Sequence, residues 1–419
     1  MHADPIYCYR PTPERAAEFA APAYDVFDRA GAAAYVEAHP RSFLAIDRPE
    51  TGFAPDHDMY AADVYEHARD LLNERVADGT LLRDEKPCYY VWRLATAESH
   101  TQTGIVAGVA VDDYEDGTVH RHEDVLKAKA QDRINHIRTT NAQTGPIFLA
   151  YRDDPTIDSL VALTTTGEPL YDFTAEDGCR HTIWRISREV AVQSLQLMFD
   201  RQVPDAYIAD GHHRCASAVA VCEERRAAAR DGKLDEAAAG ADETAPYDRF
   251  LAVLFPASQL AIMPYDRVLS DAGGLSAAEA IDAIRAAGFT VEPAEGIVDP
   301  EEAGTFGLKI GGGWWKVRLA GPAIDDPVAS LDTQIAQDRI LAPVFGVEDP
   351  TSDPRITFVG GADAADQADR KAGDTGVALT LHPTSIDQLM AVADAGKLMP
   401  PKSTWFVPKL LSGLFIRRI

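Results

Sequence analysis

The chain has 419 residues and carries 66 acidic against 40 basic side chains, so its formal net charge is −26. This acidity argues against duplex DNA, whose binding depends on neutralised phosphates, and against an anionic membrane surface. The five cysteines form no CxxC pair, and no run approaches 18 apolar residues. We therefore expect a cytoplasmic protein with no nucleic-acid and no membrane partner.

Apolar periodicity predicts strands and helices that alternate along the whole chain. The predicted elements are strands at 88–94 and 103–111, a charged helix at 123–140, strands at 146–151, 182–186 and 206–209, a helix after 211, a strand at 250–255, a helix at 276–287, a hairpin at 305–310 and 314–319, a strand at 377–382 and a helix after Ser385. This alternation indicates an α/β to α+β class with mixed sheets. Residues 225–246 predict a frayed helix end followed by a mobile loop.

The sharpest local signal is the run Asp210-Gly211-His212-His213-Arg214, where an apolar strand meets a helix. Glycine permits a tight turn, and the amides of a helix N-terminus form an anion site. Arginine grips phosphate with two nitrogens, and the histidines add donors that become cationic when protonated. Asp210 could hold a histidine tautomer or a magnesium ion. The alternative is a capped helix with two surface histidines and an Arg–Asp pair.

A second signal precedes and enters the charged helix predicted at 123–140. Glu123 follows His122, and a carboxylate at a helix start beside a histidine is a plausible general base. Lys129 and Arg133 are four residues apart, which makes that helix face locally basic. A solvated amphipathic helix explains the same pattern equally well.

Two further stretches carry candidate binding groups. One stretch follows two prolines and consists of Lys402, Ser403 and Thr404, whose ammonium and two hydroxyls suit a phosphate. The same stretch is also explained by a C-terminal strand. Tyr24 and Asp25 lie in an N-terminal turn and are uninformative alone. The sequence contains no Walker P-loop, GxGxxG, GxSxG or zinc-type cysteine pattern. A nucleotide would therefore bind without a Walker or GxGxxG motif.

Together these stretches resemble the domain of unknown function 1015 family over nearly the whole chain. The matching motifs, in order, are Tyr24-Asp25, His39-Pro40 with Ser42-Phe43, Asp113-Tyr114 with His122-Glu123, Lys129 and Asp132-Arg133, then Asp210–Arg214 and Met399–Lys409. The chain departs from the family pattern at His39, where Asn is usual, and at Asp266, where His or Asn is common.

The Asp-Gly-His-His-Arg turn also resembles the nucleotide-binding turn of the ParB/sulfiredoxin superfamily, and its chemistry is similar to that of free serine kinases. That resemblance implies a catalytic role for Glu123 as base and for Asp210, His212 and His213. It implies phosphate or nucleotide binding by a set of residues with cationic or donor groups. This set is Gly211, Arg214, His122, Lys129, Arg133, Lys402, Ser403 and Thr404. Tyr24 and Asp25 would contact substrate or support the structure.

The resemblance implies a nucleotide-dependent phosphotransferase that uses ATP or ADP and Mg²⁺ on a small hydroxyl substrate, with free L-serine as lead candidate. Two alternatives stay open: a phosphoserine phosphatase with the same pocket, and a non-catalytic ParB-like nucleotide-sensing regulator. Expected domains are an N-terminal α/β region at 1–87, a ParB/sulfiredoxin-like core at 88–260 and a C-terminal α+β region at 261–419 that closes the site. An acidic body with a local basic pocket suits a small phosphorylated ligand.

Overall fold

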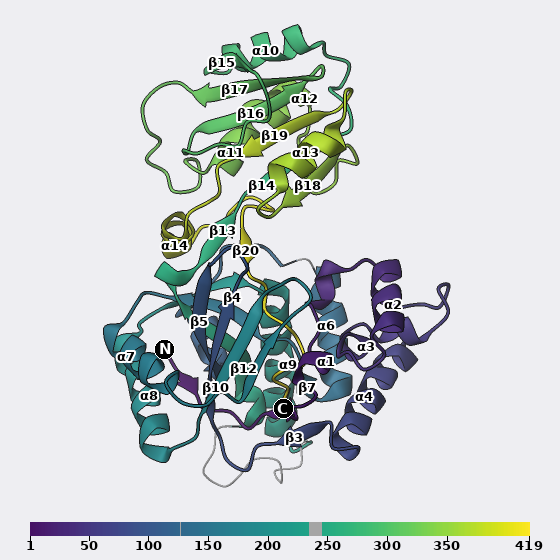
Figure 1. Ribbon diagram of the computed structural model, residues 1–419, viewed down its shortest axis with the longest axis vertical. Helices are drawn as coiled ribbons and strands as arrows, with labels where there is room; N and C mark the ends of the chain where they lie inside the picture. The colour runs from purple at the N-terminus through teal and green to yellow at the C-terminus, as the bar shows by residue number, and fades with distance from the viewer. Residues whose placement is uncertain (126, 234–244) are drawn as a thin grey trace. The chain divides into compact units, whose positions relative to one another are not determined.

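The computed structural model describes residues 1–125, 127–233 and 245–419, and only the backbone of residues 128 and 129. The chain forms two compact units, drawn in Figure 1. The first unit comprises Met1–Leu260 together with Pro408–Ile419, and the second comprises Ala261–Val407. Each unit is described by itself below.

The first unit alternates strands and helices, as the sequence predicts. Its strands are β1 (Ala3–Asp4), β2 (Tyr9–Pro11), β3 (Leu81–Arg83), β4 (Tyr89–Ala95), β5 (Thr101–Ala110), β6 (Val119–His120), β7 (Ala142–Gln143), β8 (Ile147–Tyr151), β9 (Tyr171–Thr174), β10 (Arg180–Ile186), β11 (Ala206–Asp210), β12 (Arg249–Pro256) and β21 (Arg417–Arg418). Its helices are α1 (Ala16–Phe19), η1 (Tyr24–Val26), α2 (Arg29–Ala38), α3 (Leu44–Asp47), η2 (Pro49–Gly52), α4 (Ala62–Ala77), α5 (Val111–Glu115), α6 (Lys127–Thr140), α7 (Pro155–Thr164), α8 (Glu189–Gln202), α9 (His212–Arg230), η4 (Pro246–Asp248) and η5 (Ala257–Gln259).

A mixed sheet organises the first unit. In the described residues it has nine strands in the order β6-β11-β8-β12-β5-β4-β10-β9, with β1 added beside β5. The pairs β11–β6 and β12–β8 are parallel and the other pairs are antiparallel. The fold class is therefore mixed α/β, which confirms the prediction.

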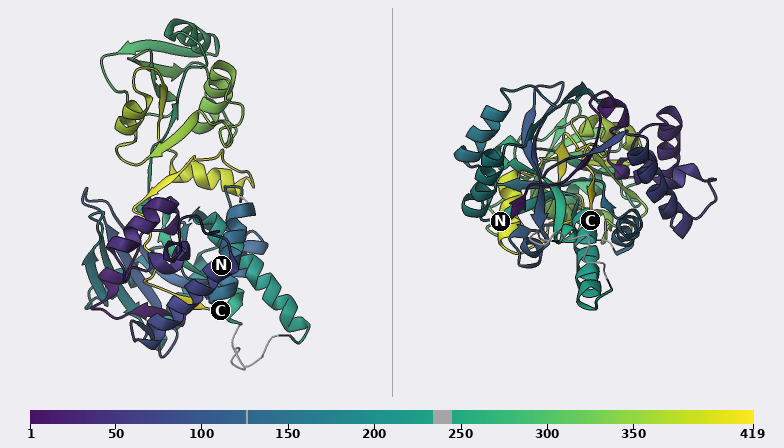
Figure 2. Two further views of the ribbon diagram at one scale, coloured as in Figure 1. Left: turned by 90° about the vertical axis from the view of Figure 1, so that its right-hand side faces the viewer. Right: turned by 90° about the horizontal axis from the view of Figure 1, so that it is seen from below.

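Alternate residues of the sheet bury one face against helices, because successive strand side chains point to opposite sides. Val109 and Leu254 of the sheet share a core with Leu195 and Phe199 of α8 and with Ala218 of α9. Figures 1 and 2 show α7 and α8 on one side of this unit and α2 and α4 on the other. The β11–α9 turn therefore connects two well-packed elements.

The segment Pro408–Ile419 packs against the opposite face of the sheet. The ring of Phe415 lies 4.8 Å from that of Tyr90 and 5.6 Å from that of Trp92, measured between centroids. Arg417 pairs with Gln143 in the short β21–β7 ladder. Because of these contacts the segment belongs to the first unit, whereas the expected domain 261–419 included it. The domain limits 1–87, 88–260 and 261–419 themselves stay a prediction.

The second unit is built on a second sheet, here of six antiparallel strands ordered β15-β17-β16-β19-β14-β18. Its strands are β13 (Ala261–Met263), β14 (Tyr265–Leu269), β15 (Phe289–Ala294), β16 (Thr305–Ile310), β17 (Gly313–Leu319), β18 (Ile356–Gly360), β19 (Val377–Leu381) and β20 (Trp405–Val407). Its helices are α10 (Ala277–Ala286), α11 (Asp332–Ala336), η6 (Gln337–Leu341), α12 (Ala342–Phe345), α13 (Ala364–Ala372) and α14 (Ile386–Asp394). The predicted hairpin is confirmed, and so is the helix predicted after Ser385, which starts at Ile386 with a capping box formed by Ser385 and Gln388.

The sequence predicted a frayed helix end and a loop at residues 225–246, and no membrane-spanning helix. α9 continues to Arg230, so residues 225–230 of the expected frayed end are helical, while 234–244 of the expected loop lie outside the described residues. Within the residues that are described, no helix combines the length and apolar character that crossing a bilayer requires.

A substitution at Gly413 tests how tightly the segment Pro408–Ile419 packs against the rest of the first unit. Its φ is +86°, and a Cβ there would lie 2.5 Å from the Cβ of Phe43. Gly413→Ala should therefore combine backbone strain of about 1–2 kcal/mol with overpacking of about 1–3 kcal/mol. Urea unfolding should show the lower stability. Gly117→Ala is the matched control, because φ is +91° there and nothing lies within 4 Å. Equal losses in both variants would contradict the packing argument.

Candidate functional site

The β11–α9 turn places the arginine of the sharpest motif over its glycine. Gly211 has φ +96° at the helix N-cap, and α9 starts at the next residue, His212. A Cβ on Gly211 would lie 3.0 Å from Nε and Nη2 of Arg214. Arg214 also donates from Nη1 to the Pro146 carbonyl at 2.8 Å. Only glycine meets both the backbone angle and the close approach of the guanidinium.

A glycine stands at the N-cap of α9. The helix has 19 residues, and its N-cap residue, Gly211, has no side chain that could cap the first turn. The first amides of a helix have no intrahelical acceptor, and the helix dipole adds positive potential at the same place. The turn therefore presents backbone donors next to the Arg214 guanidinium, a combination that suits an anion.

Asp210 anchors two cations at this turn. Its Oδ2 lies 3.3 Å from Nη2 of Arg214 and 3.4 Å from Nζ of Lys409. Burial raises the pKa of the Asp210 carboxyl, but Lys409 and Arg214 outweigh burial and hold the pKa below its usual value. The carboxylate is thus ionised at neutral pH and fixes the positions of both cations.

This environment does not suit the Mg²⁺ expected at Asp210. Magnesium takes several oxygen ligands, whereas Arg214 and Lys409 already surround this carboxylate with positive charge. The described part of the chain contains no group of three or more His, Cys, Asp or Glu side chains placed to hold a metal ion. Asp210 is therefore an anchor for cations rather than a metal ligand.

Glu123 and His212 lie together although 89 residues separate them. Nδ1 of His212 lies 3.6 Å from Oε2 of Glu123, and the His122 backbone N–H donates to Nε2 of His212 at 3.5 Å. Because Nε2 accepts, the proton of the neutral ring is on Nδ1 and faces the carboxylate. Glu123 keeps about a third of its side chain exposed (32%).

The histidine charges differ from the expectation. Burial lowers the pKa of His212 to about 4 and that of His122 well below its usual value. Both rings are therefore neutral at pH 7, and neither supplies the positive charge that the sequence suggested. The two rings meet edge to face at 4.5 Å, and both ring nitrogens of His122 are buried without a partner among the described residues. His213 instead lines a separate cavity.

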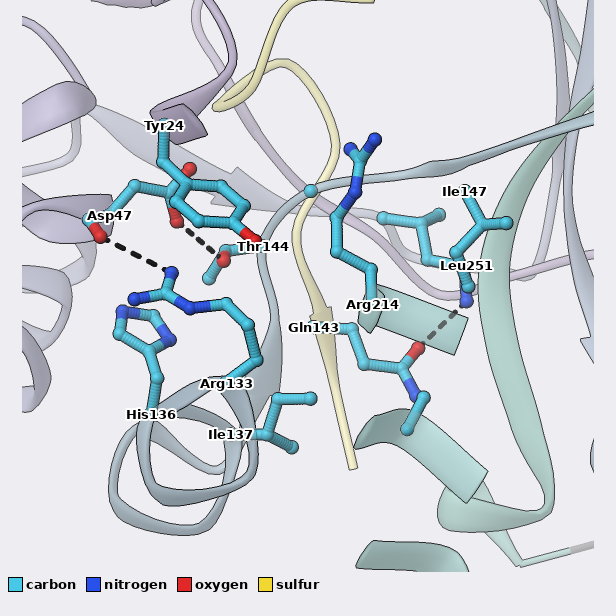
Figure 3. A pocket seen from close by; sticks show the side chains of 12 residues that line it. Tyr24, Asp47, Arg133, His136, Ile137, Gln143, Thr144, Ile147, Arg214 and Leu251 are labelled. Atoms are coloured by element: carbon cyan, nitrogen blue, oxygen red, sulfur yellow. Dashed lines mark hydrogen bonds between the residues drawn. The ribbon is translucent and has the colours of Figure 1, made fainter. Parts of the chain in front are cut away.

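Arg133 joins the site from α6 (Figure 3). Its guanidinium lies 4.3 Å from the centroid of the Tyr24 ring and 2.8 Å from Oδ2 of Asp132. It also donates to the Asp47 carbonyl at 3.3 Å. The Asp47 side chain accepts from Thr144 at 2.7 Å through Oδ1, while its Oδ2 is buried without a partner in the described structure.

Arg133 and Arg214 line one small cavity with Tyr24 and Asp47, as Figure 3 shows. Its volume is about 30 Å³, enough for one water-sized group. Burial alone lowers the pKa of an arginine, but the surrounding carboxylates outweigh it, so the pKa of both guanidiniums is raised. Two permanent positive charges from different helices therefore converge on a single small space.

Two larger cavities border these residues. One of about 250 Å³ shares Tyr24 and Arg133 with the small cavity and is also lined by Asp25 and His213. The other, of about 420 Å³, is lined mainly by apolar and aromatic residues, among them Val26, Tyr35 and Phe173, and includes Lys409. The cationic centre thus lies beside a polar cavity and an apolar one.

The structure changes one detail of the charged helix predicted at 123–140. The helix starts at Lys127, so Glu123 precedes it. The Lys129 side chain lies outside the described residues.

Lys402, Ser403 and Thr404 belong to the second unit. Ser403 is buried there, where its hydroxyl lies 3.0 Å from that of Thr333 and donates to the Pro400 carbonyl at 2.7 Å. Nζ of Lys402 lies 5.7 Å from the centroid of the Tyr265 ring. The expected phosphate role of these residues stays a prediction.

Sequence reasoning missed Asp47 and Thr144 and did not include Lys409 among the site residues. Asp47 and Thr144 are 97 residues apart, so no local spacing links them. Asp47 does follow the Ser42-Phe43 segment of the family resemblance, which was the one available signal. Lys409 ends the late motif, but only the tertiary fold brings it to Asp210.

The neutral state of His212 predicts a pH dependence. Its pKa is about 4 when folded against 6.5 when unfolded, so the unfolded chain binds the proton first as pH falls. The stabilisation is complete above about pH 6.5 and is lost between 6.5 and 4. Imidazole ¹⁵N NMR should show His212 protonated on Nδ1 and titrating near 4. His2 is the internal control, because its hydrogen bond to Asp113 raises its pKa above 6.5. A His212 titration at or above 6.5 would contradict this geometry.

Solved structures similar to this chain share little sequence with it. One is a free serine kinase variant in complex with AMP, at 12% identity and TM-score 0.36, covering 72% of this chain and 87% of the other. Another is SbnI with a C-terminal truncation from Staphylococcus aureus, at 12% identity and TM-score 0.36, covering 73% and 85%. A third is a conserved hypothetical protein from Pyrococcus furiosus, at 14% identity and TM-score 0.34, covering 72% and 90%.

No curated protein matches the chain. The model of the family described as protein of unknown function DUF1015 matches residues 4–334, well over half of the sequence. The motifs that carried the sequence resemblance at Tyr24-Asp25, His122-Glu123 and Asp210–Arg214 lie within this match. The chain therefore belongs to the DUF1015 family.

Proposed function

We propose that this protein is a nucleotide-dependent phosphotransferase that acts on a small hydroxyl substrate, with free L-serine as the lead candidate. The observation that carries the proposal is that Arg133 and Arg214 line one cavity beside the start of α9, where the N-cap residue is Gly211. Phosphoryl transfer depends mainly on positioning and charge stabilisation, so such an arrangement can support it. The choice of serine rests on the sequence resemblance to free serine kinases.

In this proposal the transferring phosphate binds at the β11–α9 turn. The first amides of α9 and the Arg214 guanidinium contact its oxygens, and Arg133 approaches from the other side of the small cavity. Asp210 acts indirectly, because it holds Arg214 and Lys409 in place. A nucleotide would bring its own magnesium, and the steps proposed here depend only on the protein's residues.

Glu123 is the proposed general base. Its carboxylate takes the proton of the substrate hydroxyl while the hydroxyl oxygen attacks the terminal phosphorus. A new oxygen–phosphorus bond forms, and the bond to the nucleotide breaks, which releases ADP from ATP or AMP from ADP. His212 acts as a positioning residue, because its Nδ1 faces Glu123 at 3.6 Å and its other nitrogen accepts from the His122 backbone. With both nitrogens oriented in this way, His212 is poorly placed as the nucleophile of a phosphatase.

The two larger cavities suggest where the remaining parts of the substrates bind. The apolar cavity of about 420 Å³ borders Lys409 and suits a nucleoside. The polar cavity of about 250 Å³ is lined by the buried pair Arg48 and Glu50, whose charged atoms lie 2.6 Å apart. A wall that carries both signs of charge complements a zwitterionic amino acid.

Turnover is tested by ³¹P NMR of the protein with L-serine and either ATP or ADP. The expected product is phosphoserine, and Glu123→Gln should lower turnover by about 10²–10⁴-fold while nucleotide affinity is kept. Glu168→Gln, at an exposed turn, is the matched control and should retain activity.

Each other outcome has a distinct meaning. Nucleotide binding without turnover in the wild type would favour the sensing regulator. Release of phosphate from phosphoserine without any nucleotide would favour the phosphatase. Full activity in the Glu123→Gln variant would show that Glu123 is not the general base.

Arg214→Lys tests the phosphate contact separately. Lysine keeps the charge but loses the planar pair of donors, so ADP affinity should fall by about tenfold or more in calorimetric titration. Arg138→Lys is the control, since Arg138 pairs with Glu224 on the surface, away from the site. An unchanged ADP affinity in Arg214→Lys would contradict a phosphate position at this turn.

A further inference from the structure

A separate cavity in the first unit gathers arginines that the proposed function does not use. It has a volume of about 830 Å³ and is lined by Arg83, Arg249, Arg417 and Arg418, with Tyr7 and Tyr9 among its other residues. We call these six residues and the space they line the arginine groove. Its lining shares no residue with the three cavities around Arg133, Arg214 and Lys409.

Arg417 is the central feature of the arginine groove. Its side chain is buried, with 8% of the residue exposed, and it donates to the Arg249 carbonyl at 3.0 Å. The same carbonyl accepts from Gln143 at 3.1 Å, so two donors converge on it and hold Arg417 in a fixed place. Burial, together with the charge of neighbouring Arg249, lowers the pKa of Arg417 to about 10.

The other arginines add charge that carboxylates only partly balance. Arg249 pairs with Asp4. Arg418 donates to the Thr140 carbonyl and to Asn73, and Arg83 lies over the Tyr7 ring at 5.2 Å. In the described structure no carboxylate forms an ion pair with Arg83, Arg417 or Arg418. The remaining acidic side chain in the lining is Asp200.

This arrangement is electrostatically unfavourable without a further anion. The Arg417 guanidinium is buried against a neutral carbonyl, and the nearby carboxylates of Asp4 and Asp248 do not outweigh its lost hydration. Adjacent guanidiniums also repel each other. The chain as a whole carries −26, so a gathering of cations in one groove does not reflect a generally basic surface. An anion in the groove would offset both costs.

We propose that the arginine groove is a second binding site, specific for a small ligand that carries two or more phosphate groups. Guanidinium groups match phosphate with paired donors, and several of them along one open groove match several phosphates. The limited volume and the acidic body disfavour a nucleic-acid polymer. The proposal is independent of phosphotransfer at the β11–α9 turn.

Inorganic pyrophosphate, titrated into the full-length protein at low salt by calorimetry, tests the second site. Arg83→Gln combined with Arg418→Gln should lower pyrophosphate affinity by about tenfold or more and leave ADP affinity at the first site unchanged. Arg214→Lys should keep pyrophosphate binding at the groove. The control is Arg180→Gln, at an exposed arginine paired with Asp172 outside the groove.

Three results would overturn the proposal: no pyrophosphate binding in the wild type, equal affinity in wild type and groove variant, or loss of binding in Arg214→Lys alone. The last result would place pyrophosphate at the β11–α9 turn. If circular dichroism shows that the double variant does not fold, the Arg83→Gln variant alone is the test, because Arg83 is exposed and its guanidinium lies over the Tyr7 ring.

Discussion

The contact on which the site depends is the placement of the Arg214 guanidinium directly over Gly211. The left-handed backbone of Gly211 ends β11 and starts α9, and the absence of a Cβ lets the guanidinium approach to 3.0 Å of where that atom would be. Pro146 and Asp210 then fix the guanidinium from two sides. The sheet and α9 share one core, so packing holds this turn in place. Helix amides and a guanidinium are thereby presented together, before any ligand arrives.

Partly buried carboxylates organise the cations in an otherwise strongly acidic protein. Asp210 holds Arg214 and Lys409, and Asp132 holds Arg133 beside Tyr24. The histidines that the sequence made prominent play a different part, since burial leaves His212 neutral and turned toward Glu123. Positive charge at the site therefore comes from arginine and lysine. The net charge of −26 argues against a polyanionic partner such as duplex DNA, but it does not prevent a cationic pocket built from a few fixed groups.

Local patterns predicted central strands of both sheets and the centre of the candidate site, but not the helices α2, α4, α7 and α8. The Asp210–Arg214 turn could be read from the sequence because a strand, a glycine and a helix start are neighbours in the chain. The link between Asp47 and Thr144, and that between Asp210 and Lys409, could not, since each joins residues far apart that only packing brings together. The charge of His212 was also beyond sequence reasoning, because the pKa depends on burial. The start of α6 at Lys127 instead of Glu123 reflects the weak definition of helix ends by charge pattern.

The most direct test of the central claim is a crystal structure of the full-length protein with ADP. The account predicts the phosphates at the start of α9, within hydrogen-bond distance of the first-turn amides and of the Arg214 guanidinium, with Glu123 facing the terminal phosphate. Phosphates bound away from Gly211–Arg214, in the arginine groove or elsewhere, would contradict it.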